Sequence, residues 1–208
     1  MANPLEVAWA AFDPTDPSTL QRFILAIQAI CQHFGMASSS AASAFYEHER
    51  HQAGLGHFAT HVAPPADLQK VEASIRWATK DLWAPNPDIE AAKVKVTGVV
   101  EKNVLDTGRQ TILDNVQRDR EALGWARVPE PGACSFCALL ATRGMVYRSD
   151  KTASFEAHDH CRCHAEPVFT AYEPSAQIRE WQRIYSESTK GIHGPAAMRR
   201  AFRKALSS

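Results

Sequence analysis

The chain contains 208 residues, with 23 basic and 23 acidic side chains, a formal net charge of zero and 45% hydrophobic residues. This composition is typical of a globular protein with one large domain, or one domain with an appendage, and argues against a disordered chain, a collagen or a coiled-coil rod. Zero net charge also argues against a protein that coats nucleic acid through its overall charge. The sequence has no apolar run of roughly 18 residues for a spanning helix, and Met1–Glu6 lacks the features of a signal peptide. We therefore expect no membrane anchor and no export by the usual signal.

The charge is unevenly distributed along the chain. Residues 1–50 carry two basic and five acidic side chains, whereas residues 175–208 carry seven basic and two acidic ones. A basic tail of this size can contact nucleic acid or an acidic partner, and a solvated helical face is the simpler alternative. Five net charges would give only weak, salt-sensitive binding.

Apolar residues recur every three or four positions through the first half, which predicts helices. The expected helices cover residues 16–35, 36–51, 67–84 and 88–124, with a loop at 53–65. Asp16 and Pro17 supply an N-terminal cap, and Gly35 predicts a C-terminal stop. The second helix is rich in alanine and serine, which would permit close helix contact. Thr107-Gly108 predicts an interruption or bend in the fourth helix.

The character of the sequence changes at Trp125. Residues 127–172 combine prolines, glycines and clustered cysteines with short β-like runs at 145–147 and 166–169. Two more helices are expected at 175–188 and 195–206. We therefore predict a mainly α fold with a helical domain (1–124), a small α+β module that binds zinc through Cys and His (125–172) and basic C-terminal helices (173–208).

The five cysteines do not suggest a disulfide scaffold. Cys31 lies in an apolar helical pattern and is expected to be a small core residue. The other four form two close pairs, Cys134 with Cys137 and Cys161 with Cys163. In a chain without a secretion signal, such pairs indicate a metal site.

The spacing of these residues predicts one structural zinc per chain. Two ligands separated by two residues can bind one ion from a single tight turn, and both Cys134/Cys137 and His158/Cys161 have this spacing. We expect Cys134, Cys137 and His158 as ligands, with either Cys161 or Cys163 as the fourth. His160 and His164 are then spare surface histidines. Four protein ligands leave no position for water, so the site would be structural.

Enzyme motifs are not matched. His164-Ala165-Glu166 follows the cysteine pair, which inverts the order of a zinc deaminase. His48 and His51 are three residues apart rather than the four of a metalloprotease helix, so Tyr46–His51 is expected to be a surface helix of mixed charge. No nucleophile elbow, phosphate loop or dinucleotide motif occurs, although a dispersed Ser/His/Asp triad stays open.

The order Cys-x-x-Cys, then His-x-x-Cys-Arg-Cys, resembles the C-terminal motif of the phage Mu F-like (MuF-like) minor head proteins. The flanking residues are similar to MuF-like proteins of phages that infect actinobacteria, which are often labelled minor capsid protein or capsid maturation protease. The residues that carry this similarity are Ser43–Tyr46, Ser74–Ala78, Arg109–Thr111, Gly124–Val128, Pro131–Ala141, Arg143, Gly144 and Tyr147. The resemblance implies a head component encoded beside the portal, present in few copies, with a metal-stabilised C-terminal module.

These observations predict a structural minor capsid protein of a tailed phage, acting in head assembly at or near the portal. The expected partners are the portal protein, the major capsid protein or both, with packaged DNA as a further candidate through the basic C-terminus. Neither a membrane nor a small-molecule substrate is expected. The protein should be located in the virion, in the capsid interior or at the portal vertex, after assembly in the host cytoplasm. The alternatives are a capsid maturation protease and a zinc-containing nucleic-acid-binding protein.

Overall fold

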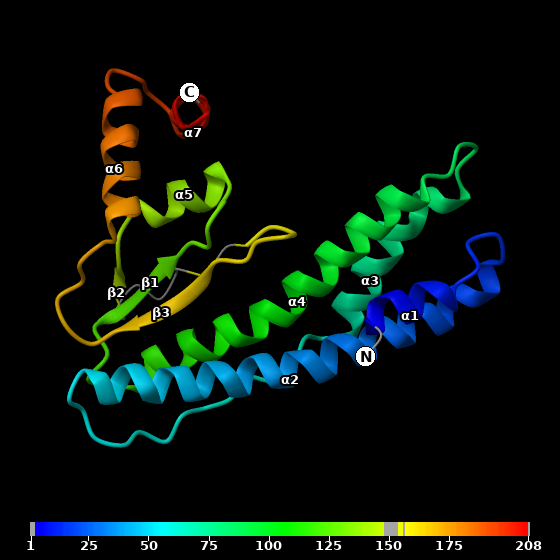
Figure 1. The fold of residues 1–208 in the computed structure, drawn as a ribbon, viewed down its shortest axis with the longest axis horizontal. Coiled ribbons are helices and arrows are strands. Elements are labelled where there is room, and N and C mark those ends of the chain that lie inside the picture. The colour runs from blue at the N-terminus through cyan, green and yellow to red at the C-terminus, as the bar shows by residue number, and fades with distance from the viewer. Residues whose placement is uncertain (1–2, 148–153, 156, 208) are drawn as a thin grey trace. The chain divides into compact units, whose positions relative to one another are not determined.

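The structure is a computed structural model that describes residues 3–147, 154–155 and 157–207 (Figure 1). Within these residues the fold is mainly helical with one small sheet, which confirms the predicted class. The helices are α1 (Pro4–Ala10), α2 (Leu20–Gln52), α3 (Leu68–Thr79), α4 (Ile89–Arg118), α5 (Ser135–Ala141), α6 (Ala176–Ser188) and α7 (Pro195–Leu206). The strands are β1 (Gly124–Val128), β2 (Val146–Tyr147) and β3 (His164–Val168), and short 3-10 helices occur at Pro17–Thr19 and Lys80–Trp83. None of the described helices has both the length and the apolar character needed to cross a membrane.

The contacts divide the chain into two compact units. The first unit comprises Met1–Phe45, Thr60–Thr111 and Glu156–Cys161, and the second comprises Tyr46–Ala59, Ile112–Phe155 and Arg162–Ser208. Helices α2 and α4 therefore contribute residues to both units. The three domains expected from the sequence follow the chain in order, and that division stays a prediction. Residues 148–153 and 156 of the expected zinc module lie outside the described residues.

An apolar core holds the first unit together. Buried side chains recur every three or four residues along α2, α3 and α4, as the sequence pattern predicts for helices that share one core. They include Ile24, Ile27 and Cys31 on α2, Val71 and Ile75 on α3, and Ala92 and Val96 on α4. Burial raises the pKa of the Cys31 thiol to about 11, so the thiol stays protonated at neutral pH. Cys31 is thus the small core residue that was expected.

Helix α1 was not expected from the sequence. The Asn3 side chain accepts a hydrogen bond from the Leu5 amide at 3.0 Å, and Pro4 occupies the first turn. The short helix places Trp9 against Phe23, with ring centroids 4.7 Å apart. Seven residues are too few to show a clear helical period. The formation of this helix therefore depends on its packing against α2.

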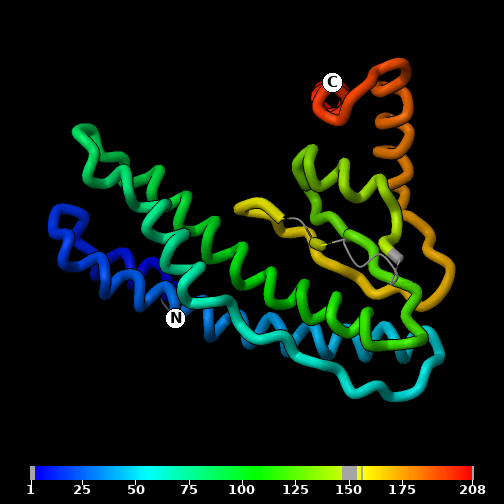
Figure 2. The backbone as a smooth tube through the Cα atoms, turned by 180° about the vertical axis from the view of Figure 1, so that it is seen from behind, coloured from blue at the N-terminus to red at the C-terminus, as the bar shows by residue number. Residues whose placement is uncertain are grey.

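Two glycines had a different role from the one predicted. Helix α2 continues through Gly35, so the predicted stop is wrong, and α4 continues through Gly108, so of the predicted interruption or bend the interruption is wrong. A Cβ on Gly35 would lie 3.3 Å from Thr107 Oγ1, and one on Gly108 would lie 2.6 Å from Ser38 Oγ. Both glycines therefore allow α2 and α4 to pack closely, which confirms the close contact expected of the small side chains. The two helices run side by side in both views (Figures 1 and 2).

The second unit contains an antiparallel sheet in the order β2-β1-β3. Trp125 pairs with Val146 on one side, and Ala126 pairs with Glu166 on the other. The β-like runs expected at 145–147 and 166–169 correspond to β2 and β3. The central strand β1 was missed because its first four residues are all buried, so it has no alternation of polar and apolar residues.

Three helices complete the second unit. The predicted helices at 175–188 and 195–206 are confirmed as α6 and α7. The Ser175 hydroxyl accepts a hydrogen bond from the Ile178 amide at 3.3 Å and caps α6. Phe202 of α7 packs into a small core with Ala138 and Leu139 of α5.

The second unit also contains a buried ion pair. Arg50 Nε donates to Asp119 Oδ2 at 2.8 Å, and the two side chains are only 10% and 3% exposed. The Tyr46 hydroxyl donates to the same oxygen at 3.2 Å. The prediction that Tyr46–His51 forms a surface helix is therefore wrong for Tyr46 and Arg50, which face the interior, whereas His48 and His51 are exposed as expected.

Candidate metal centre

Cys134 and Cys137 lie at the start of helix α5. Gly132 adopts a positive φ of 79°, and the Ala133 amide donates to the Glu130 carbonyl at 3.0 Å, which forms a tight turn before the helix. Cys134 is the residue that precedes the first turn, and Cys137 lies within that turn. Residues three apart in a helix share one face, so the helix presents both thiols in the same direction.

His158, Cys161 and Cys163 come from the segment that leads into β3. The Cys161 amide donates to the His158 carbonyl at 3.1 Å, so these residues form a turn, and His160 within it has a positive φ of 61°. Cys161 and Cys163 are buried, whereas His158 is exposed. The turn and the short helix α5 are the local structures that two closely spaced ligands require.

The structure brings the five candidate ligands into two overlapping groups. One group contains Cys134, Cys137 and His158, and the other contains Cys137, Cys161 and Cys163, with the ligand atoms of each group within 4.8 Å of one another. Cys137 belongs to both. Tetrahedral zinc with bonds of about 2.3 Å requires sulfur atoms roughly 3.8 Å apart, which this limit accommodates. The cluster can therefore hold a metal ion.

The chemistry of the donors fits zinc. Thiolates and imidazole are soft or borderline ligands, and none of the five cysteines forms a disulfide. His158 Nδ1 lies 2.5 Å from the Asp159 carbonyl oxygen. Since a carbonyl oxygen only accepts, this contact favours the tautomer with the proton on Nδ1, in which Nε2 is the nitrogen that can coordinate a metal. Which four residues form the ligand set, and whether Cys161 or Cys163 completes it, stays a prediction.

The other two histidines make carboxylate contacts. His160 Nδ1 lies 3.0 Å from Glu101 Oε2, and His164 Nδ1 lies 3.9 Å from Glu130 Oε1. Both side chains are nearly half exposed. Neither belongs to a potential metal-binding group in the described part of the chain. This arrangement agrees with their expected place at the surface.

In the first unit, the turn at 158–161 packs on α4. Arg109, whose side chain is 3% exposed, donates through Nη2 to the Cys161 carbonyl oxygen at 2.5 Å. Its Nη1 donates to Asp106 Oδ1 at 2.7 Å, which holds the guanidinium in place. Arg109 was not singled out as a site residue, because its contact with Cys161 joins positions 52 apart in the sequence.

The comparisons with known proteins give a family. A family model described as VG15 protein matches residues 1–188, which include all five candidate ligands. The chain belongs to the VG15 family. This is a family of viral gene products, and the chain is thus a phage-associated protein. No curated protein and no solved structure matches the sequence.

In this VG15 family member, Gly98→Ala should displace the turn that carries His158 and Cys161. A Cβ on Gly98 would lie 2.8 Å from His160 Nε2 and 2.9 Å from Asp159 Cβ, distances that require the turn to move. We expect faster release of bound zinc to a chelating dye, even though alanine in a helix interior is favoured over glycine by about 1 kcal/mol.

Gly56→Ala is the matched control, because a Cβ there meets no atom within 4 Å. It should leave the rate of zinc release unchanged. An unchanged rate in Gly98→Ala, together with a higher melting temperature, would show that the contact between α4 and the turn does not support the metal centre.

Proposed function

We propose that this protein is a structural minor capsid protein of a tailed phage, and that it acts in head assembly at or near the portal. The observation that carries the proposal is the cluster of Cys134, Cys137, His158, Cys161 and Cys163 in a chain of a phage-associated family. These are the residues at which the sequence resembles the MuF-like head proteins. The virion is then the proposed location.

The proposed role of the metal is structural. The cluster offers five donors for the four positions of tetrahedral zinc, so protein ligands would fill the coordination shell and leave no place for a substrate water. Thiolate-rich closed sites of this kind stabilise small modules that lack a large apolar core. The proposal therefore assigns no catalytic step to the metal.

The proposed partners are the portal protein, the major capsid protein or both. The basic residues of α7 add a second contact, for which DNA and an acidic protein face are the two candidates. Arg199, Arg200, Arg203 and Lys204 are all exposed, which supports a role in binding. No membrane and no small-molecule substrate is part of this proposal.

The copy number in purified heads tests the proposal. Quantitative mass spectrometry of proheads and of mature, DNA-filled heads should find the chain in a low, constant ratio to the portal protein. A maturation protease, the runner-up function, would be depleted or cleaved in mature heads. Absence of the chain from mature heads, together with cleavage of the coat protein that depends on one of its Ser or His residues, would refute the structural role.

A further inference from the structure

Helix α7 has one apolar face and one cationic face. Phe202, which is 1% exposed, anchors the helix through an edge-to-face contact with Tyr185, their ring centroids 5.5 Å apart. The helix contains four basic residues and no acidic one. The apolar contacts therefore fix the helix on α5 and α6 while its cations stay in solvent.

A groove of about 350 Å³ lies between α5 and α7, and we call it the α5–α7 groove. One wall is formed by Ala196, Arg199, Arg200 and Arg203 of α7. Their spacing of three, four and seven residues places them on one face of the helix. The other wall is formed by Ser135, Phe136 and Leu139 of α5, so none of the described residues that line the groove carries a carboxylate.

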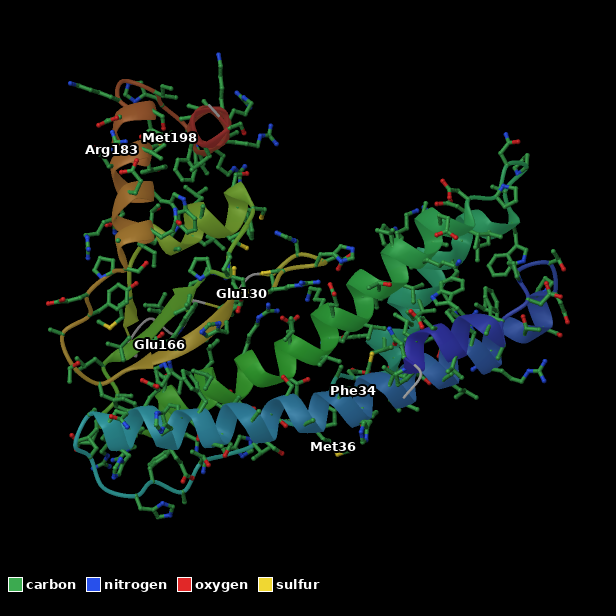
Figure 3. The ribbon with its side chains drawn as sticks, viewed as in Figure 1. Phe34, Met36, Glu130, Glu166, Arg183 and Met198 are labelled. Carbon is green, nitrogen blue, oxygen red and sulfur yellow. The ribbon has the colours of Figure 1, made fainter. Side chains whose placement is uncertain are left out.

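The arginines of this groove have no acidic partners within residues 3–147, 154–155 and 157–207. The contrast with α6 is direct. Arg183 lies on α6 (Figure 3), where Glu180 and Glu187 contact its guanidinium at 2.6 and 2.8 Å. The charge of Arg183 is thus neutralised within its own helix, whereas Arg199, Arg200 and Arg203 line one groove with no such partner in the described part of the chain.

We propose that the α5–α7 groove binds the phosphodiester backbone of DNA. This inference rests on the proposed function and selects DNA from its two candidate partners of α7. Arg199 and Arg203 are separated by about 6 Å along the helix axis. This distance is close to the rise along one DNA strand over two successive phosphate steps. Guanidinium groups bind phosphate oxygens through paired hydrogen bonds, so arginines on one helix face suit a phosphodiester backbone.

The test is DNA binding by the full-length, metal-loaded protein, measured as fluorescence anisotropy of a labelled 20-base-pair duplex. Three phosphate contacts give a slope of about −2.7 for log K against log salt, a loss of roughly 40-fold between 50 and 200 mM salt. The triple variant Arg199→Gln, Arg200→Gln, Arg203→Gln should bind at least about ten-fold more weakly at 50 mM salt and lose most of this slope. The corresponding Arg→Lys triple should keep the slope, because lysine retains the charge.

A second triple variant separates the groove from the overall charge. Arg179→Gln, Arg183→Gln, Lys190→Gln removes the same charge from the same segment but from residues that do not line the groove. It should retain the affinity and the slope of the unmodified protein. Circular dichroism of each variant checks that α6 and α7 remain folded.

Two competitors distinguish other anions from DNA. Inorganic phosphate at constant ionic strength should not displace the duplex, and polyglutamate of matched charge should bind more weakly than DNA. Displacement by phosphate would assign the groove to a small phosphate compound, and equal or tighter binding of polyglutamate would assign it to an acidic protein. Either result overturns the proposal. So does an equal loss of DNA affinity in the groove variant (Arg199→Gln, Arg200→Gln, Arg203→Gln) and in the control variant (Arg179→Gln, Arg183→Gln, Lys190→Gln). If the chain is present in mature heads but does not bind DNA, the proposed DNA binding by the groove is refuted and the proposed function is unaffected.

Discussion

Cys137→Ser is expected to remove the metal from the protein and to open the module around it. Cys137 belongs to both groups of potential ligands, so its loss disrupts the cluster whichever cysteine completes the ligand set. A structural zinc contributes on the order of 10 kcal/mol of binding free energy that is coupled to folding. Elemental analysis should find about one zinc per chain in the unmodified protein and almost none in the variant. Limited proteolysis should then cut within residues 129–169, while the helices of the first unit persist.

Cys31→Ala is the matched control for loss of a buried thiol. Cys31 is fully buried in the helical core of the first unit and belongs to neither metal-binding group, so zinc content should be unchanged. The fourth ligand is identified by comparing the zinc content of Cys161→Ser with that of Cys163→Ser. The variant that loses the metal lacks that ligand. Freshly purified, unchelated protein without metal, or an intact module in Cys137→Ser, would contradict the zinc site.

The metal should also be lost as the pH falls. Cysteine binds zinc as the thiolate, so protons compete with the metal for each sulfur atom. The stability that the metal contributes is therefore present at neutral and higher pH and decreases in acid. Zinc release to a chelating dye, followed from pH 8 to pH 4, should increase steadily in the unmodified protein and in Cys31→Ala alike.

Asp119→Ala is expected to lower the free energy of unfolding of the second unit by about 3–5 kcal/mol. The substitution leaves the Arg50 guanidinium buried without its counter-ion, and removal of one partner from a buried pair is far more costly than removal of an exposed pair. Chemical denaturation followed by the fluorescence of Trp125 and Trp181 measures this loss. Tyr46→Phe should cost about 1 kcal/mol, the value of one hydrogen bond to the same carboxylate.

Glu187→Ala provides the control for an exposed ion pair. Glu187 and Arg183 are more than half exposed and screened by solvent, so their separation should leave the free energy of unfolding almost unchanged. A loss below 1 kcal/mol in Asp119→Ala would show that the pair between Arg50 and Asp119 is not structurally important.

Much of the fold is encoded in local patterns that can be read directly from the sequence. The helices α3, α6 and α7 were predicted within a few residues, because their apolar positions recur with the helical period and their ends carry caps or prolines. The sequence also pointed to the residues that the structure brings together in a cluster able to hold a metal ion, because two ligands within one turn need only a short segment of chain. Cys134, which precedes the first turn of α5, and Cys137 within that turn illustrate this.

The tertiary structure decided the features that depend on residues distant in the sequence. Gly35 and Gly108 are compatible with helix ends by local criteria, and only the close packing of α2 on α4 shows why glycine occurs inside both helices. Arg50 and Tyr46 lie in a polar run that resembles a surface helix. Their side chains are buried because Arg50 pairs with Asp119, which lies 69 residues further along the chain. The groove between α5 and α7 likewise joins segments separated by some sixty residues. The spacing of residues close in the sequence determines secondary structure and pairs of metal ligands. Burial of a residue depends instead on which distant side chains contact it, and these contacts form only in the folded chain.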